Sequence, residues 1–362
     1  MEPKLLSTLS GEKIATKEAW EEFRREECLS LLSKYVYGVR PAGIPKKLEF
    51  SEECAERAVN SIFFKKIKIT VDGFSFPVRI FYPKSEKPLP TIVYVMHTAQ
   101  ETTTDIENEP NNLYIPIEDI ANQGYAVCVF YFRDIYQDKL EDVDYENSLF
   151  KVYSRPRCER EDDEWASVSI WAYAASRVFD YLETDDLFDK NNVAIAGHSR
   201  GGKTALWTGA TDKRYSFVIS NSSGCMGAAM LRGKLGEHVQ FITDYTDWFA
   251  KNLSRYAKEE ELLPVDQHML LALIAPRLLY VKSDVLDEWS DPAAERRSAR
   301  LASEVYELYG LDGVIIPEDS EIEVAKSYHD GNIGYHVSEG DHKIRREDWE
   351  KFIPFWEKHR GI

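Results

Sequence analysis

Hydrophobic residues along this chain gather in short continuous runs that are separated by longer amphipathic stretches. The runs at residues 91–96 (TIVYVM) and 125–131 (YAVCVFY) contain few polar side chains, which is typical of strands buried on both faces of a sheet. The stretch at residues 164–183 places apolar residues at helical spacing and predicts an amphipathic helix. Further strands are predicted at 63–71, 74–82, 193–196, 216–220, 277–282 and 334–337, and further helices at 16–37, 113–123, 202–211, 247–256, 265–274, 292–309 and 346–359.

The order of these elements indicates how the sheet is built. Strands that alternate with helices form a mostly parallel central sheet with helices on both faces, which is an α/β fold. Residues 63–71 and 74–82 are joined through Asp72-Gly73, and an Asp-Gly pair between β-rich runs is a strong hairpin signal. We therefore expect an antiparallel edge at the N-terminal side of the sheet.

A sharp turn, Gly197-His198-Ser199-Arg200-Gly201, stands between a predicted strand and a predicted helix. Strand, turn and helix around G-x-S-x-G form the nucleophile elbow of the α/β-hydrolase fold, which projects a serine hydroxyl from the top of the sheet. Glycines fit this turn because side chains would collide with the neighbouring strand and helix. We predict that Ser199 is a nucleophile. The alternative is a glycine-rich turn without catalysis.

A serine nucleophile needs a base, and the base needs an acid that orients it. In this fold the chain order is serine, acid, histidine. The loop after the penultimate strand offers three acids, which are Asp284, Asp287 and Glu288. The loop before the last helix offers His342, which we favour as the base over His336, because His336 lies on a predicted strand where packing is expected.

Two hydrogen-bond donors are expected to stabilise the oxyanion. One is the N–H of Arg200, and the other comes from the loop at residues 98–100. His198 is expected to have a structural role. His268 is expected either in the core or in the wall of the substrate site. The histidines nearest the predicted site do not share metal-ligand spacing, so we expect no metal, and the mechanism needs no cofactor.

Lys203 is a candidate for substrate binding, because it follows Ser199 by four residues and lies on the same side of the predicted helix. A cation at this position could instead be a solvated surface lysine. It could also be paired with a nearby carboxylate such as Asp247 or Asp266.

The composition narrows the classes of partner. The chain of 362 residues carries 62 acidic and 45 basic residues and a net charge of −17, which argues against nucleic acid as a partner. Its five cysteines are scattered without a C-x-x-C pair, so neither a zinc site nor a disulfide framework is indicated. No signal peptide and no membrane-length apolar stretch is visible, and we expect a cytoplasmic protein unless a leader has been removed. We expect residues 1–362 to form a single α/β-hydrolase domain with residues 1–60 as a helical N-terminal extension packed on it, and the oligomeric state stays open.

Several motifs in this chain resemble those of the glucuronoyl esterase family of carbohydrate esterases, in its bacterial branch. The resemblance spans nearly the whole chain, and several motifs in order are more specific than one elbow. It rests on GHSRGGKTALWTGA (197–210), DYTDWFAKNLSRY (244–256), LPVDQHMLLALIAPRLLYV (263–281), DEWSDP (287–292) and GYHVSEGDHKIRREDWEKF (334–352), together with residues 20–26 and 36–41.

The resemblance implies roles for particular residues. Arg200 would help to hold the oxyanion, Lys203 would contact the sugar, and Trp289 would contact the sugar ring. Many members carry a triad glutamate where this chain has Ser222, and bacterial members can instead use an acid on the loop of Asp287. The loop after residues 91–96 also lacks the Asn-Phe-x-Gly-Asn run of the family, so the substrate could differ from the typical one.

We therefore predict a serine carboxylic-ester hydrolase that acts on carbohydrate, with a catalytic triad of Ser199, Asp287 and His342. The resemblance implies 4-O-methyl-glucuronoyl esters derived from glucuronoxylan as substrates, and so a part in xylan degradation. Two alternatives stay open. One is an acetyl-xylan or other sugar deacetylase with the same triad, and the other is a catalytically silent carbohydrate-binding protein on a hydrolase frame.

Overall fold

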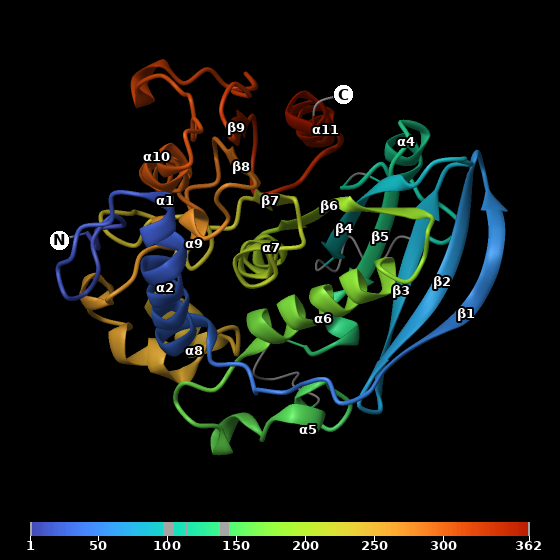
Figure 1. Ribbon diagram of the computed structural model, residues 1–362, viewed down its shortest axis with the longest axis horizontal. Helices are drawn as coiled ribbons and strands as arrows, with labels where there is room; N and C mark the ends of the chain where they lie inside the picture. The colour runs from blue at the N-terminus through green and yellow to red at the C-terminus, as the bar shows by residue number, and fades with distance from the viewer. Residues whose placement is uncertain (1, 97–104, 113, 138–144, 361–362) are drawn as a thin grey trace.

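A computed structural model describes residues 2–96, 105–112, 114–137 and 145–360 of the chain. Nine strands in this part form one sheet in the order β1-β2-β3-β5-β4-β6-β7-β8-β9 (Figure 1). Pairing is antiparallel from β1 to β5 and parallel from β5 to β9, which confirms the α/β-hydrolase fold with an antiparallel N-terminal edge. The strands are β1 (Leu48–Val59), β2 (Ile62–Val71), β3 (Phe74–Tyr82), β4 (Leu89–Met96), β5 (Ala126–Tyr131), β6 (Phe188–His198), β7 (Phe217–Asn221), β8 (Leu278–Asp284) and β9 (Ile333–Ser338).

Helices cover both faces of this sheet. Alternate residues of a buried strand point to opposite faces, and β4 shows it: Val93 and Val95 pack into one apolar cluster, whereas Ile92 and Tyr94 pack into the other. Helices α6, α7, α9 and α10 cover the first face, and α4 and α11 cover the second (Figure 1). The helices are α1 (Lys17–Ala19), α2 (Arg25–Leu32), α4 (Ile117–Asn122), α5 (Phe150–Tyr153), α6 (Ser167–Leu182), α7 (Arg200–Thr211), α8 (Val239–Tyr245), α9 (Gln267–Ala272), α10 (Pro292–Leu308) and α11 (Arg346–Arg360).

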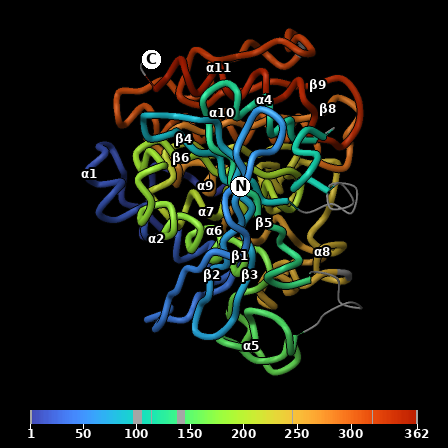
Figure 2. Tube along the Cα trace, turned by 90° about the vertical axis from the view of Figure 1, so that its right-hand side faces the viewer, coloured from blue at the N-terminus to red at the C-terminus, as the bar shows by residue number. Residues whose placement is uncertain are grey.

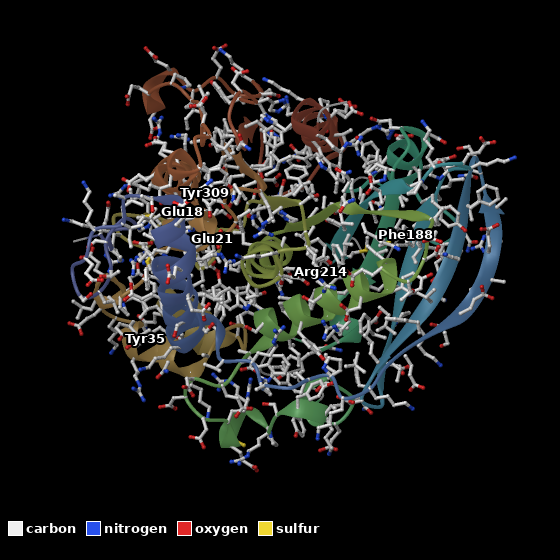
Figure 3. All side chains as sticks on the ribbon, in the orientation of Figure 1. Glu18, Glu21, Tyr35, Phe188, Arg214 and Tyr309 are labelled. Atoms are coloured by element: carbon white, nitrogen blue, oxygen red, sulfur yellow. The ribbon has the colours of Figure 1, made fainter. Side chains whose placement is uncertain are left out.

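The N-terminal helical segment runs from α1 through two π-helical stretches, Trp20–Arg24 and Ser33–Tyr37, around α2. The hydroxyl of Thr16 accepts from the N–H of Ala19 and caps the start of α1. Glu21 links this segment to the rest of the molecule through hydrogen bonds from Lys213 and from Tyr309, both Glu21 and Tyr309 being labelled in Figure 3.

The prediction that residues 1–60 form a helical extension was wrong in part, because Leu48–Val59 form the edge strand β1. Its sequence, LEFSEECAERAV, is mostly polar and exposed, so it lacks the hydrophobic alternation by which a strand is recognised. The predicted hairpin between β2 and β3 is confirmed. Asp72 and Gly73 both have positive φ, 47° and 98°, as a tight two-residue hairpin turn requires. Figure 2 is turned so that this edge of the sheet faces the viewer.

Other elements also differ from the predictions. Helix α4 begins at Ile117, after Pro116, because proline favours the start of a helix over its interior. The helix expected at 247–256 is a 3-10 helix at Lys251–Tyr256, and helix α8 was not predicted. None of these differences affects the parallel strands, whose carboxyl ends meet at one edge of the sheet, where His198, Asn221, Asp284 and Ser338 end β6 to β9.

Candidate active site

Ser199 occupies a strained turn between β6 and α7. Its φ of 55° and ψ of −123° lie outside the regions that most residues adopt. The N–H of Ser199 donates to the carbonyl of Asn221 at 2.8 Å, which fixes the turn to the end of β7. A Cβ on Gly197 would lie 2.2 Å from the carbonyl oxygen of Gly201, so this close approach requires glycine.

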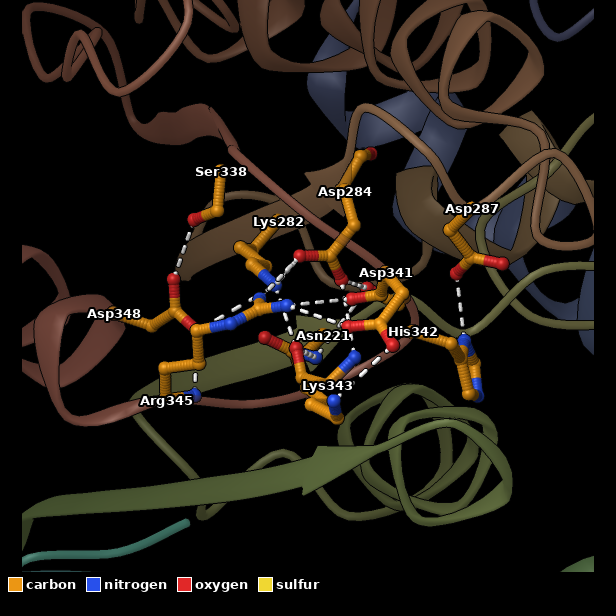
Figure 4. A network of polar contacts seen from close by, with 12 residues as sticks. Asn221, Lys282, Asp284, Asp287, Ser338, Asp341, His342, Lys343, Arg345 and Asp348 are labelled. Atoms are coloured by element: carbon orange, nitrogen blue, oxygen red, sulfur yellow. Dashed lines mark hydrogen bonds and ion pairs between the residues drawn. The ribbon is translucent and has the colours of Figure 1, made fainter. Parts of the chain in front are cut away.

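His342 lies in the loop between β9 and α11, with its Nδ1 2.6 Å from Oδ2 of Asp287 (Figure 4). Burial raises the pKa of the Asp287 carboxyl, but hydrogen bonds from His342 and Ser290 and the charge of the imidazole outweigh it, so the pKa lies below its ordinary value. The Asp287 carboxylate is therefore ionised at neutral pH and accepts from the Nδ1–H of the imidazole.

The other two acids of the same loop are occupied differently. The carboxylate of Asp284 is buried and accepts from Lys282 at 2.7 Å and from Arg345 at 2.6 Å. Glu288 is exposed to solvent. Of the three acids predicted from the sequence, Asp287 is the one that the structure brings to His342.

The remaining histidines of this region have structural contacts. His336 is fully buried between the hydroxyl of Tyr280 and the carboxylate of Asp348, each at 3.0 Å, and burial lowers its pKa to about 4. The ring of His198 packs against that of His342, with 4.5 Å between centroids, and its Nδ1 accepts from Asn221 at 2.7 Å. His198 thus supports one face of the candidate base.

The backbone of the first turn of α7 presents the N–H of Arg200 next to the nucleophile. The guanidinium of Arg200 lies 4.9 Å from the centroid of the Trp248 ring, close enough for a cation–π contact. Residues 98–100, expected to supply the second oxyanion donor, lie outside the described residues.

Lys203 lies one turn of α7 beyond Ser199 and is only 2% exposed, so it is not a solvated surface lysine. Its Nζ donates to the carbonyl of Ser223 at 2.6 Å and pairs with Oε2 of Glu237 at 3.2 Å. The carboxylate that neutralises it is therefore Glu237, neither Asp247 nor Asp266. Asp247 is held by Arg160, Arg157 and Tyr136, and Asp266 is held by Arg232.

Trp289 follows Asp287 in the same loop and is 50% exposed. Its ring meets that of Phe241 edge to face, with 5.0 Å between centroids. The carbonyl of Trp289 accepts from the N–H of Glu237 at 2.7 Å, so the backbone ties the exposed ring to the segment that carries the partner of Lys203. Trp289 therefore offers an apolar face next to a buried pair of opposite charges.

His268 is found in a different surrounding from the one proposed for a substrate contact. It lies on α9 with its ring buried, and its Nε2 lies 2.8 Å from the carbonyl of Pro3 in the N-terminal segment. Burial lowers the pKa of the imidazole, so the ring is a neutral part of the packing there. Of the two settings that the sequence left open for His268, the structure supports the core.

Sequence reasoning missed three residues of the site, namely Glu237, Trp248 and Ser290. Ser290 donates its N–H to Asp287 at 3.1 Å, and its hydroxyl lies 3.2 Å from Nδ1 of His342. Glu237 lies in an irregular segment without a motif, so no feature of the neighbouring sequence indicated a role in the site. Ser290 could have been found, because it follows Asp287 by three residues in a tight turn.

A serine on a strand–turn–helix elbow, followed in the chain by an aspartate and a histidine in hydrogen-bond contact, defines a serine hydrolase of the α/β-hydrolase class. Similarity to known proteins then gives the particular group. The family described as "Glucuronyl esterase, fungi" matches residues 66–310. The chain belongs to the glucuronoyl esterase family of carbohydrate esterases.

Individual relatives agree with this assignment. The chain is 32% identical to carbohydrate esterase MZ0003, from an unknown prokaryotic organism, over 99% of this chain and 89% of that protein. It is 27% identical to a 4-O-methyl-glucuronoyl methylesterase of Thermothelomyces thermophilus, over 85% and 72% of the two chains. The structure of a glucuronoyl esterase from Solibacter usitatus superposes with a TM-score of 0.89 at 30% identity, covering 100% of this chain and 98% of that one.

Proposed function

We propose that this esterase cleaves 4-O-methyl-glucuronoyl esters, with Ser199, His342 and Asp287 as its catalytic residues. His342 takes the proton of the Ser199 hydroxyl while the oxygen attacks the ester carbonyl. Asp287 holds the imidazole in the tautomer that can accept that proton. The N–H of Arg200, at the start of α7, donates to the oxyanion that forms, aided by the nearby guanidinium.

Collapse of the tetrahedral intermediate passes the same proton from His342 to the leaving alcohol and leaves Ser199 acylated by the uronic acid. Water then attacks the acyl group, with His342 again as the base, and the free glucuronate departs. The overall reaction consumes one water molecule for each ester cleaved. It requires neither a redox partner nor a cofactor.

The buried pair of Lys203 and Glu237 is the observation that supports a sugar on the acyl side. A lysine ammonium donates hydrogen bonds and a carboxylate accepts them, so together they match vicinal hydroxyl groups. Both side chains are nearly buried. A substrate without matching hydroxyl groups would leave them without a hydrogen-bond partner in the sugar, at a high cost in binding free energy. The half-exposed ring of Trp289 adds an apolar surface for a pyranose.

The test compares benzyl glucuronate, methyl glucuronate and acetylated xylan as substrates of the unaltered protein. We expect hydrolysis of the two glucuronate esters and little release of acetate. Faster release of acetate would favour a sugar deacetylase, and no labelling of Ser199 by a fluorophosphonate would favour a carbohydrate-binding protein. Ser199→Ala should lower kcat on the order of 10⁶-fold without loss of folding.

A further inference from the structure

The loop that carries His342 lies at the surface, yet its backbone is tied to buried charges. Asp341 and Lys343, on either side of His342, are exposed. Arg345, further along, donates to the carbonyl of Asp341 at 2.8 Å. The position of the imidazole therefore depends on what holds the peptide groups of this short loop.

Both polar atoms of the Lys343 backbone are bound to residues at the strand ends. Its carbonyl accepts from Nζ of Lys282 at 2.7 Å and from Nδ2 of Asn221 at 3.2 Å. Its N–H lies 3.4 Å from Oδ2 of Asp284. Lys282 and Asp284 thus hold the residue that directly follows His342 (Figure 4).

These anchors belong to a set of paired charges at the end of β8. Lys282 and Asp284 are each 0% exposed and pair at 2.7 Å. Arg345 pairs with Asp284 at 2.6 Å, and Asp348 lies 3.5 Å from Nζ of Lys282. Arg345 also pairs with the exposed Asp341 at 3.1 Å. Each buried charge of the set therefore has a partner of opposite sign, which is the condition under which buried ions are tolerated.

We propose that Lys282 is the positioning residue for the catalytic histidine, holding His342 through the Lys343 carbonyl at the distance that its bond to Asp287 requires. Strand β8 ends in Lys282 and Asp284, and Asp287 follows three residues later. One strand end therefore carries both the acid of the triad and the anchor of the base. This inference rests on the proposed role of His342 as the base.

Loss of Lys282 has two expected effects on the loop. The Lys343 carbonyl keeps only the bond from Asn221, and Asp284 and Asp348 lose the cation that they share. The loop is expected to move and to displace the imidazole of His342. A displacement on the order of 1 Å lowers turnover roughly 10²-fold. The residues proposed to bind the sugar lie on other elements, so substrate binding should change little.

The experiment compares Lys282→Met with Lys358→Met. Lys358 also pairs with a carboxylate, Asp330 at 2.6 Å, but lies on α11 and has no bond to the loop of His342. We expect Lys282→Met to lower kcat roughly 10²-fold with KM within about threefold of the parent. Lys358→Met should leave both constants unchanged. An unchanged kcat in a folded Lys282→Met variant would overturn the proposal.

A spectroscopic measurement separates positioning from a merely structural role. The Nδ1–H of His342 in its short bond to Asp287 should give a far-downfield proton resonance, which we expect to shift or broaden in Lys282→Met and to persist in Lys358→Met. This readout needs no substrate, so it tests the position of the imidazole even if the proposed ester is wrong. A resonance unchanged in Lys282→Met would count against the proposal.

A second variant addresses the case in which Lys282→Met does not fold. The double variant Lys282→Met, Asp284→Asn removes one cation and one anion, so charge stays balanced while the bond to the Lys343 carbonyl is still lost. We expect the same loss of kcat and the same change in the proton resonance. Normal values of both in this variant would also overturn the proposal.

Discussion

The hydroxyl of Ser222 donates to Oδ2 of Asp284 at 2.7 Å, directly beside the triad. Ser222 stands at the end of β7, where the family resemblance leads one to expect a triad glutamate. A carboxylate is present near that place, but it comes from β8 and is already neutralised by Lys282 and Arg345. The acid bonded to His342 is Asp287 instead.

This arrangement predicts different outcomes for the three acids of the loop. Asp287→Asn should lower kcat on the order of 10⁴-fold by spoiling the tautomer of His342. Glu288→Gln should have no effect, since its side chain is exposed. Steady-state kinetics on a glucuronate ester would check this, and comparable losses in both variants would contradict the assignment.

Asp284→Asn should lower stability. The substitution removes the carboxylate that pairs with both cations, so Lys282 keeps only Asp348, at 3.5 Å, and Arg345 keeps the exposed Asp341. Breaking a buried pair in this way costs about 3–5 kcal/mol. Urea unfolding would measure this cost. An Asp284→Asn protein as stable as the parent would show that water reaches the cluster.

Lys203→Met should discriminate between substrates. We expect kcat/KM for a glucuronate ester to fall by about 1–3 kcal/mol, because a hydroxyl and the Glu237 carboxylate lose their donor. The same variant should hydrolyse 4-nitrophenyl acetate nearly as the parent does. Trp289→Ala, at an exposed side chain, should show the same selectivity without loss of stability. Equal losses on both substrates would assign Lys203 and Trp289 structural roles.

Gly197→Ala should prevent normal closure of the elbow. Its Cβ would lie 2.2 Å from the Gly201 carbonyl, a contact that only movement of the backbone can relieve. We expect a loss of stability of about 3 kcal/mol or more. Gly43→Ala is the matched control, because Gly43 has a positive φ but no atom within 4 Å of the added Cβ, so its cost should stay near about 1 kcal/mol. Chemical unfolding of both variants would test the difference.

Stability should fall in mild acid because of His336. Burial lowers its pKa from 6.5 to about 4 in the folded protein, so the unfolded chain binds the proton first. The free energy of unfolding should therefore decrease as pH falls from about 6.5 to about 4. His336→Gln should flatten this part of the profile of Tm against pH. An unchanged slope in that variant would assign the acid sensitivity to other groups.

The sequence was sufficient wherever a constraint is local. The elbow could be predicted because Gly197 and Gly201 mark a turn that admits no side chain, and the buried strands could be predicted from their continuous apolar runs. The choice among Asp284, Asp287 and Glu288 could not be made from the residues alone. It depends on how the loops after β8 and β9 face each other, which is a property of tertiary packing.

Glu237 shows a different limit. Its role comes from a contact with Lys203, 34 residues away, between a helix and an irregular segment. Neither periodicity nor a motif marks such a pair, and burial alone turns two ordinary charged residues into a binding surface. The edge strand β1 was missed for the opposite reason, since its exposed faces carry few apolar side chains.

The acid and the base of the triad are both attached to the end of β8, Asp287 through the chain and the loop of His342 through Lys282 and Asp284. The nucleophile lies on the β6–α7 elbow, whereas the acid and the base lie on the loops after β8 and β9. A triad acid at the end of β7 would require a carboxylate in place of Ser222. It would also require a neutral residue in place of Asp284, which lies 2.7 Å from the Ser222 hydroxyl. Introducing this triad into another hydrolase would therefore require Lys282 and Arg345 in addition to Asp287 and His342.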